Sequence, residues 1–243
     1  MNTSDRSPAT LVLLVRHGQA SVPDQEGRYR SLGDIPLTPV GIAQAQRAGE
    51  LMRSVRLDDI WASDLRRARE TATIIADACE MPVQQDMRLR ELVAGDLDGS
   101  TPEEVERDNP QFLPWIQSGF HQGFPGPGNY VPADLQFPGG ESIVEAGARV
   151  TARYQELIRQ YAGGCLAMVT HAWVTSAILC HVLKLPTTEY YRLGIANAGV
   201  SLVRVDAEGH GVLEALNLSV PLDALAGGSL AGRTRDITTG RTR

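Results

Sequence analysis

This sequence lacks a long hydrophobic run. None of its apolar stretches approaches the roughly 18 residues that a membrane-spanning helix requires. The five apolar residues that follow the polar start MNTSDRSPAT are too few for a secretory signal. Apolar residues make up 42% of the chain and charged residues 21%, which is typical of globular proteins. We therefore expect a soluble, cytoplasmic protein with no membrane partner.

Cysteine is scarce. Cys79, Cys165 and Cys180 are odd in number and show neither CxxC nor metal-ligand spacing. This pattern predicts unpaired thiols in a reducing compartment, and it predicts no cofactor or metal held by cysteine.

An excess of positive charge is missing as well. The formal net charge is −6, whereas a broad nucleic-acid surface needs clustered lysine and arginine. The composition therefore argues against a nucleic-acid partner. Any phosphate group that this protein handles must meet a local positive pocket.

The chain is long enough for one large domain, and no internal repeat or break in composition divides it. We expect a polar extension over residues 1–9 and a folded domain over 10–225. Residues 226–243 contain four arginines and almost no large apolar side chain, which predicts a disordered tail. The oligomeric state stays open, with a dimer as one possibility.

Strand-like and helix-like segments alternate along most of the chain. Apolar runs predict buried strands, and apolar residues at helical spacing, such as Ile42, Ala45, Ala48 and Leu51, predict helices. The predicted strands are 11–15, 59–62 and 166–170, and the predicted helices are 39–55, 65–79, 143–161 and 173–183. A hairpin is predicted from VSLVRVD and GVLEALN around AEGH. The fold class is α/β, with a mixed, mostly parallel sheet flanked by helices on both faces.

Residues 100–140 interrupt this alternation. They are rich in proline and glycine, and a long irregular segment within a compact fold is usually a lid or binding loop. We predict an inserted cap with short helices around 102–107 and 111–117.

Two histidines follow two of the predicted buried strands. LVLLV runs into Arg16, His17 and Gly18, and LAMVT runs into His171. Ligands of parallel sheets lie beyond the carboxyl ends of the strands. A lone histidine is more often structural, but two in matched positions predict a site at this edge.

The helix predicted at 65–79 carries Arg66, Arg67 and Arg69 near its start, after Ser63 and Asp64 as a predicted cap. We expect two of these arginines, Arg66 and Arg69, to be solvated and paired with Asp64 and Glu70. One of the three could reach an anion shared with Arg16.

A phosphoryl group is an anion that suits two arginines and two histidines. Arginine forks match its oxygens, a neutral histidine can attack phosphorus, and a second histidine can donate to the equatorial oxygens. Glu91, in RLRELVAGDLDG, is the best-placed candidate for the acid that protonates the leaving oxygen. Gly18 would let the backbone approach the phosphate closely.

Six motifs follow one another along the chain: LVRHGQA, DIPLTPVGIAQA, SDLRRARETA, RLRELVAGDLDG, PGGES and MVTHAWVTSAIL. In this order they resemble the histidine phosphatase superfamily, the phosphoglycerate mutase-like proteins. The resemblance spans roughly residues 10 to 217, and six motifs are far more specific than RHG alone.

This resemblance implies His17 as the phosphorylated nucleophile and Glu91 as the proton donor. It implies Arg16, Arg67 and His171 as the phosphate-binding groups, and it places Asn197 near the site. It also implies a mostly parallel sheet between helices, with a cap inserted before PGGES.

The chain departs from the family pattern at three places. Pro23 stands where many members have an asparagine, Ala172 where glycine is frequent, and Leu97 where tryptophan is common. No core catalytic group is lost, but Pro23 changes the mouth of the pocket.

The predicted function is hydrolysis of a small phosphorylated metabolite, a phosphomonoester, through a phosphohistidine on His17 without metal or other cofactor. A phosphoglycerate mutase-type transfer is the alternative, and it needs a cap that binds anions. Besides His121, the cap has Arg107 as its one basic residue, and Arg28 and Arg30, in the loop after His17, could add positive charge to the pocket. Its aromatic residues suit an apolar or neutral substrate body or pack on one another: Phe112, Trp115, Phe120, Phe124, Tyr130 and Phe137.

Two further classes stay open. A metal-dependent hydrolase could use His17, His171, Glu91 and Asp98, although HxH or HExxH spacing is absent and Arg16 would repel a cation. A non-catalytic phospholigand-binding protein could also use this fold. We assign no function to His181 or His210.

Overall fold

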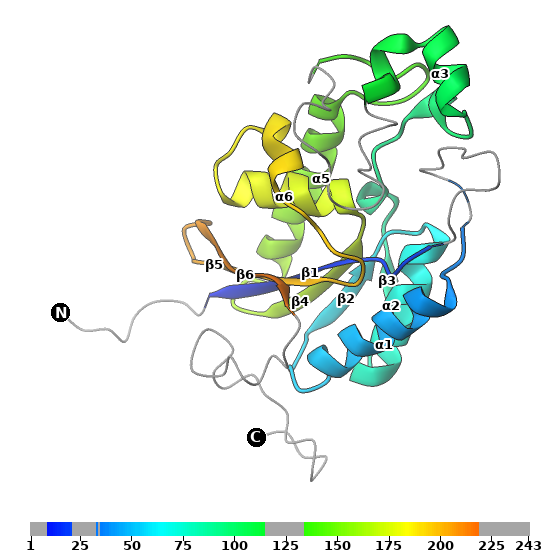
Figure 1. Ribbon diagram of the computed structural model, residues 1–243. Coiled ribbons are helices and arrows are strands. Elements are labelled where there is room, and N and C mark those ends of the chain that lie inside the picture. Colours follow the sequence, from blue (N-terminus) through cyan, green and yellow to red (C-terminus); the bar gives the residue numbers. More distant parts are fainter. Residues whose placement is uncertain (1–8, 21–32, 34, 115–133, 219–243) are drawn as a thin grey trace.

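The computed structural model describes residues 9–20, 33, 35–114 and 134–218 (Figure 1). Several predictions fall outside these ranges. They concern the tail, Pro23, the two loop arginines, and the cap residues between 115 and 133.

The described chain forms a six-stranded sheet with the order β3-β2-β4-β1-β5-β6. The first four strands in this order run parallel, and β5 and β6 add an antiparallel hairpin at one edge. The predicted mixed, mostly parallel sheet is therefore confirmed. The strands are β1 (Thr10–Arg16), β2 (Asp59–Ala62), β3 (Gln84–Gln85), β4 (Cys165–Thr170), β5 (Val200–Val205) and β6 (Gly211–Leu218).

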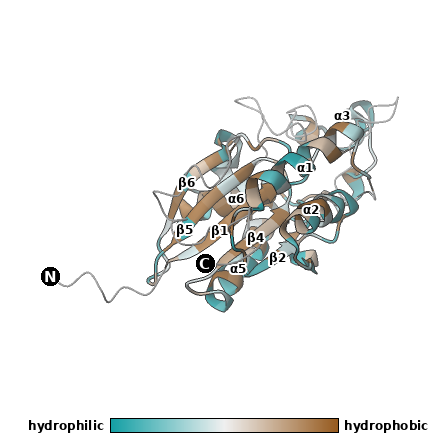
Figure 2. Ribbon diagram, turned by 90° about the horizontal axis from the view of Figure 1, so that it is seen from below, coloured by the Kyte–Doolittle hydropathy of each residue, from teal (hydrophilic) through white to brown (hydrophobic). Residues whose placement is uncertain are grey.

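Helices cover both faces of the sheet (Figure 1). Side chains of β1 alternate between the two faces: Val12 and Leu14 pack in one core cluster, and Leu11, Leu13 and Val15 pack in the other. The first cluster lies under α5 (Ile143–Gln160) and α6 (Ala172–Val182), and the second under α1 (Pro39–Met52) and α2 (Arg66–Cys79). Two-sided burial explains why β1 is a continuous apolar run, drawn mostly in brown in Figure 2.

The remaining elements are short. They connect β3 to α5 and α6 to β5, and they include the described part of the segment predicted to form a cap. They are η1 (Met87–Leu89), η2 (Gly95–Leu97), α3 (Pro102–Asp108), η3 (Pro110–Phe112) and η5 (Thr187–Arg192). No helix in the described ranges is both long and apolar enough to cross a membrane.

Three details of the predicted helices are wrong. The first helix ends at Met52 rather than at residue 55, and Ile42 is 42% exposed. Gly41 lies on the buried face of the helix instead. At this point α1 is so close to the backbone of Gln19 that a side chain would not fit. The second helix is not capped by Ser63 or Asp64: Leu65 is the N-cap residue and makes no side-chain capping bond.

The start of α1 supports the loop that follows β1. The Thr38 side chain accepts a hydrogen bond from Gly41 N–H and donates to the Gln19 side-chain oxygen. A β-carbon built on Gly41 would lie 2.0 Å from the Gln19 carbonyl oxygen. Glycine at this position therefore allows the helix to touch the loop that begins with His17 and Gly18.

We expect Gly41→Ala to destabilise the protein by about 1 to 3 kcal/mol, because the added methyl group overpacks a backbone contact. Helix propensity alone predicts the opposite sign, a gain of up to about 1 kcal/mol. Urea unfolding measures the change. Ala43→Gly, at an exposed position of the same helix, calibrates the propensity. A Gly41→Ala protein as stable as the wild type would contradict the close contact.

Candidate active site

The two predicted site histidines lie side by side at the carboxyl edge of the sheet. His17 follows β1 directly and His171 follows β4 directly, and these strands are parallel neighbours with Arg16 opposite Thr170. The ring centroids are 5.2 Å apart with an interplanar angle of 63°. His17 is 8% exposed and His171 is fully buried.

Two arginines border His17. Arg16, the last residue of β1, is 2% exposed and its Nη1 donates to the carbonyl of Ile195 at 2.7 Å. Arg67, in the first turn of α2, is 4% exposed and its Nε donates to His17 Nε2 at 3.1 Å. Of the three arginines of that helix, Arg67 is therefore the one that reaches the site.

The other two arginines point elsewhere. Arg66 pairs with Glu70 at 2.7 Å. Arg69 donates to the backbone carbonyl of Asp64 rather than to its carboxylate. That carboxylate instead binds Arg90, whose Nε donates to it at 2.7 Å.

A hydrogen bond to the backbone fixes the tautomer of the His17 ring. Its Nδ1 lies 2.7 Å from the carbonyl of Gly18. A carbonyl oxygen only accepts, so Nδ1 carries the proton and Nε2 keeps its lone pair. Asn197 Nδ2 also donates to the carbonyl of His17 at 3.2 Å, which places this asparagine beside the site.

Thr71 ties the loop after β1 to α2. Its Oγ1 accepts the N–H of Gly18 at 3.0 Å and donates to the carbonyl of Arg67 at 2.7 Å. The loop and the helix turn that carries Arg67 are thereby held together. Thr71 was not among the site residues predicted from the sequence, although it belongs to the SDLRRARETA motif.

Burial and positive charge keep both histidines neutral. Burial lowers the pKa of His17 well below its usual value, and Arg67 and Arg16 lower it further. The same causes, burial first and then Arg67, lower the pKa of His171. Burial also lowers the pKa of Arg16 to about 10, so this guanidinium stays charged at neutral pH.

Glu91 shares the site with these cations. It is half-buried, and burial raises the pKa of its carboxyl although Arg67 and Arg16 oppose the shift. Its Oε1 accepts the N–H of Leu92 at 3.0 Å, and its Oε2 faces the N–H of Trp173 at 3.4 Å. Its side chain therefore reaches the start of α6, next to His171.

Arg149 of α5 holds the segment that carries Glu91. Its guanidinium donates to the carbonyls of Arg88 at 2.8 Å and Arg90 at 3.0 Å, and it faces that of Glu91 at 3.4 Å. It also binds both carboxylate oxygens of Glu141, at 2.6 and 2.7 Å. Arg149 was not among the site residues predicted from the sequence, and Glu141 of the PGGES motif was the one sign of this cluster.

The two aromatic residues of the predicted cap that lie within the described ranges pack against each other. Phe112 and Phe137 are buried against each other, with ring centroids 4.6 Å apart. The expectation of an apolar substrate body therefore depends on the four aromatic residues outside the described ranges. Arg107 is exposed and pairs with Asp108.

The structure gives no support to the metal-binding alternative. Among the described residues, the only histidine, cysteine or acidic side chains grouped closely enough to share an ion are Asp206, Glu208 and His210, in the β5–β6 turn. The four residues proposed for a metal site are not such a group.

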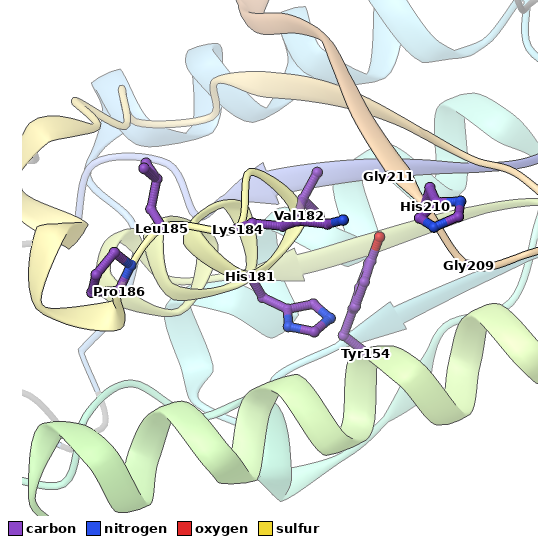
Figure 3. A pocket seen from close by; sticks show the side chains of 9 residues that line it. All are labelled: Tyr154, His181, Val182, Lys184, Leu185, Pro186, Gly209, His210 and Gly211. Atoms are coloured by element: carbon purple, nitrogen blue, oxygen red, sulfur yellow. The ribbon is translucent and has the colours of Figure 1, made fainter.

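A pocket of 420 Å³ lies at the opposite end of the sheet (Figure 3). It is formed where the end of α6 meets the β5–β6 turn, and none of the predicted site residues lines it. His181 and His210, to which the sequence analysis gave no function, lie here with Tyr154, Lys184 and Pro186.

Comparisons with known proteins agree on one family. A family model described as the histidine phosphatase superfamily (branch 1) matches residues 12–219. A protein of Yersinia enterocolitica, "Probable phosphoglycerate mutase GpmB", is 34% identical over 195 residues, covering 80% of this chain and 84% of that protein.

Solved structures share the fold. A mycobacterial glucosyl-3-phosphoglycerate phosphatase superposes with a TM-score of 0.70 at 27% identity, over 87% of this chain and all of that one. The α-ribazole phosphatase of Shigella flexneri superposes with a TM-score of 0.69 at 21% identity, over 86% of this chain and 97% of that one.

The buried neutral histidines predict how stability depends on pH. Below about pH 6.5 both histidines are protonated in the unfolded chain but not in the folded protein. The unfolded state therefore binds more protons, and the free energy of unfolding decreases as the pH is lowered. His17→Gln removes one of the two groups. We expect it to reduce this slope by up to about 1.4 kcal/mol per pH unit.

Urea unfolding between about pH 5 and pH 7.5 measures the two slopes. Ala43→Gly, which removes no titratable group and lies at an exposed position, is the control and should keep the wild-type slope. Equal slopes for the wild type and His17→Gln would show that His17 titrates in the folded protein as it does in the unfolded chain.

Proposed function

The chain belongs to branch 1 of the histidine phosphatase superfamily, and from this premise we propose that it is a metal-independent phosphomonoester hydrolase. Its substrate would be a small phosphorylated metabolite. The catalytic groups would be His17, Glu91, His171, Arg16 and Arg67. We retain the cytoplasm as its proposed location.

One observation carries the proposal: His17 is a neutral imidazole whose unprotonated Nε2 faces a guanidinium. The Gly18 carbonyl holds the proton on Nδ1, and Arg67 lies 3.1 Å from Nε2. A phosphoryl group brought to the arginines would therefore meet the lone pair of Nε2. Planar guanidinium forks are well suited to bind its oxygens.

The first chemical step would form an N–P bond and break the ester P–O bond. His17 Nε2 attacks phosphorus, and Glu91, protonated at the start, gives its proton to the leaving alkoxide. Burial of the Glu91 carboxyl favours its protonated form. The raised pKa thus suits an acid that works near neutral pH.

The second step would reverse the proton transfer. Glu91, now a carboxylate, takes a proton from water as the water oxygen attacks phosphorus. The N–P bond breaks, and inorganic phosphate and neutral His17 are released. Arg16, Arg67 and His171 would stabilise the charge on the phosphoryl oxygens in both steps.

We prefer hydrolysis over mutase transfer because the described cap offers no cation aimed at the site. Within residues 100–114 and 134–140, Arg107 is the single basic residue, and it pairs with Asp108 at the surface. A mutase must hold a second phosphate group there. The Yersinia relative, which is named as a mutase, keeps mutase transfer as the alternative.

Hydrolysis of a chromogenic aryl phosphate in the presence of EDTA tests the proposal. We expect turnover by the wild type and none by His17→Ala, because no other described group offers a neutral imidazole to phosphorus at this position. Circular dichroism and urea unfolding should show that the variant is folded.

Three outcomes would count against the proposal. Near wild-type turnover by His17→Ala would remove the phosphohistidine step, and activity lost only with EDTA would revive a metal mechanism. If the wild type does not hydrolyse aryl phosphates but interconverts phosphoglycerates, the mutase would be favoured.

Glu91→Gln tests the acid. We expect a loss of about 10²- to 10⁴-fold for alkyl phosphates, which need protonation of the leaving oxygen. The loss should be much smaller for a nitrophenyl ester, whose phenolate leaves without it. Values of kcat/KM across a series of leaving groups measure the difference. An equal loss across the series would remove Glu91 from the acid role.

A further inference from the structure

The ring of His171 is fully buried, and within the described ranges its Nε2 has one hydrogen-bond partner and its Nδ1 has none. Nε2 lies 2.9 Å from the hydroxyl of Ser63. Nδ1 is buried and has no hydrogen-bond partner among the described residues. Since a neutral imidazole has one donor and one acceptor, the Ser63 contact decides which of the two nitrogens carries the proton.

The hydrogen bonds of Ser63 can be counted completely within the described part of the chain. Its oxygen accepts the N–H of Leu65 at 3.3 Å. Its one proton has a single acceptor within reach there, namely Nε2 of His171. If Nε2 carried a proton instead, the buried hydroxyl would lose its acceptor, which is costly.

The sheet itself positions this contact. β2, β4 and β1 are consecutive parallel strands, and Ser63, His171 and His17 are the first residues after each of them. The N–H of Ser63 also donates to the carbonyl of Val169 at 3.0 Å. The serine is therefore fixed to the strand that carries the histidine.

We propose that Ser63 is a positioning residue that fixes the tautomer of His171, so that Nδ1–H is the free donor presented to the phosphoryl oxygens. The inference deepens the proposed function and rests on it for the identity of the ligand. The assignment of the tautomer is independent of the ligand. The opposite tautomer would present a lone pair to an anion, which is repulsive.

The tautomer can be read directly by ¹⁵N NMR of the full chain labelled with ¹⁵N-histidine. We expect His171 of the wild type to show a protonated Nδ1 and an unprotonated Nε2. The His171→Gln spectrum assigns the resonances. A protonated Nε2 in the wild type would overturn the proposal, whatever the activity of the enzyme.

Inorganic phosphate is the probe for the donor role. We expect its addition to shift the His171 Nδ1–H resonance of the wild type. Phosphate binding that shifts His17 but leaves His171 unchanged would show that Nδ1–H is not the donor. Because this readout needs no turnover, it stays informative even if aryl phosphate hydrolysis fails and the proposed function with it.

Three substitutions separate positioning from general destabilisation. Ser63→Ala should populate the other tautomer and lower kcat by about 10- to 100-fold, the loss that follows when a group that orients a metal-binding histidine is removed. Ser63→Thr keeps the hydroxyl and should restore the wild-type tautomer. Ser176→Ala removes a buried hydroxyl of α6 that donates to the Leu193 carbonyl, and should leave both tautomer and kcat unchanged.

An unchanged tautomer in folded Ser63→Ala would contradict the proposal. So would a loss of kcat in Ser176→Ala as large as that in Ser63→Ala. If Ser63→Ala does not fold, the wild-type spectrum still tests the tautomer, and its response to phosphate still tests the donor role of Nδ1–H.

Discussion

The arrangement of the candidate site depends on positive charge that is buried at the carboxyl edge of the sheet. Arg16 and Arg67 are each less than 5% exposed, and burying a guanidinium is costly unless other groups compensate it. Backbone carbonyls of the neighbouring segments supply part of the compensation. The rest of the site follows from this charge: the histidines beside it stay neutral, and an anion entering the site gains by completing the compensation.

The same charge acts differently on the three titratable groups around it. It adds to burial in lowering the pKa of His17 and of His171, because both effects disfavour an imidazolium. It opposes burial at Glu91, where the charged form is an anion. One cluster thus keeps two neutral imidazoles and a carboxyl group with a raised pKa within the same site.

Much of this could be predicted from the sequence, because continuous apolar runs and helical spacing identify β1, β4 and the helices after them. Strand ends then place His17 and His171 at one edge. The predicted cap of α2 was wrong for a tertiary reason: Ser63 and Asp64 contact His171 and Arg90, which are distant in sequence. Arg149 was missed because three of its partners are backbone carbonyls, which leave no mark in a sequence, and its carboxylate partner Glu141 lies eight residues away along the chain.

Arg149 also links the position of Glu91 to the segment that was predicted to form a cap. Glu91 lies on a segment without regular secondary structure, so its position depends on contacts from outside that segment. Arg149 supplies them from α5, and its partner Glu141 lies on the chain returning from the cap. A β-carbon on Gly140 would lie 2.1 Å from the Val93 carbonyl oxygen, so the two segments are in backbone contact. A shift of the returning cap segment would therefore move the carboxyl of Glu91, whereas His17 and His171 are held by the strands themselves.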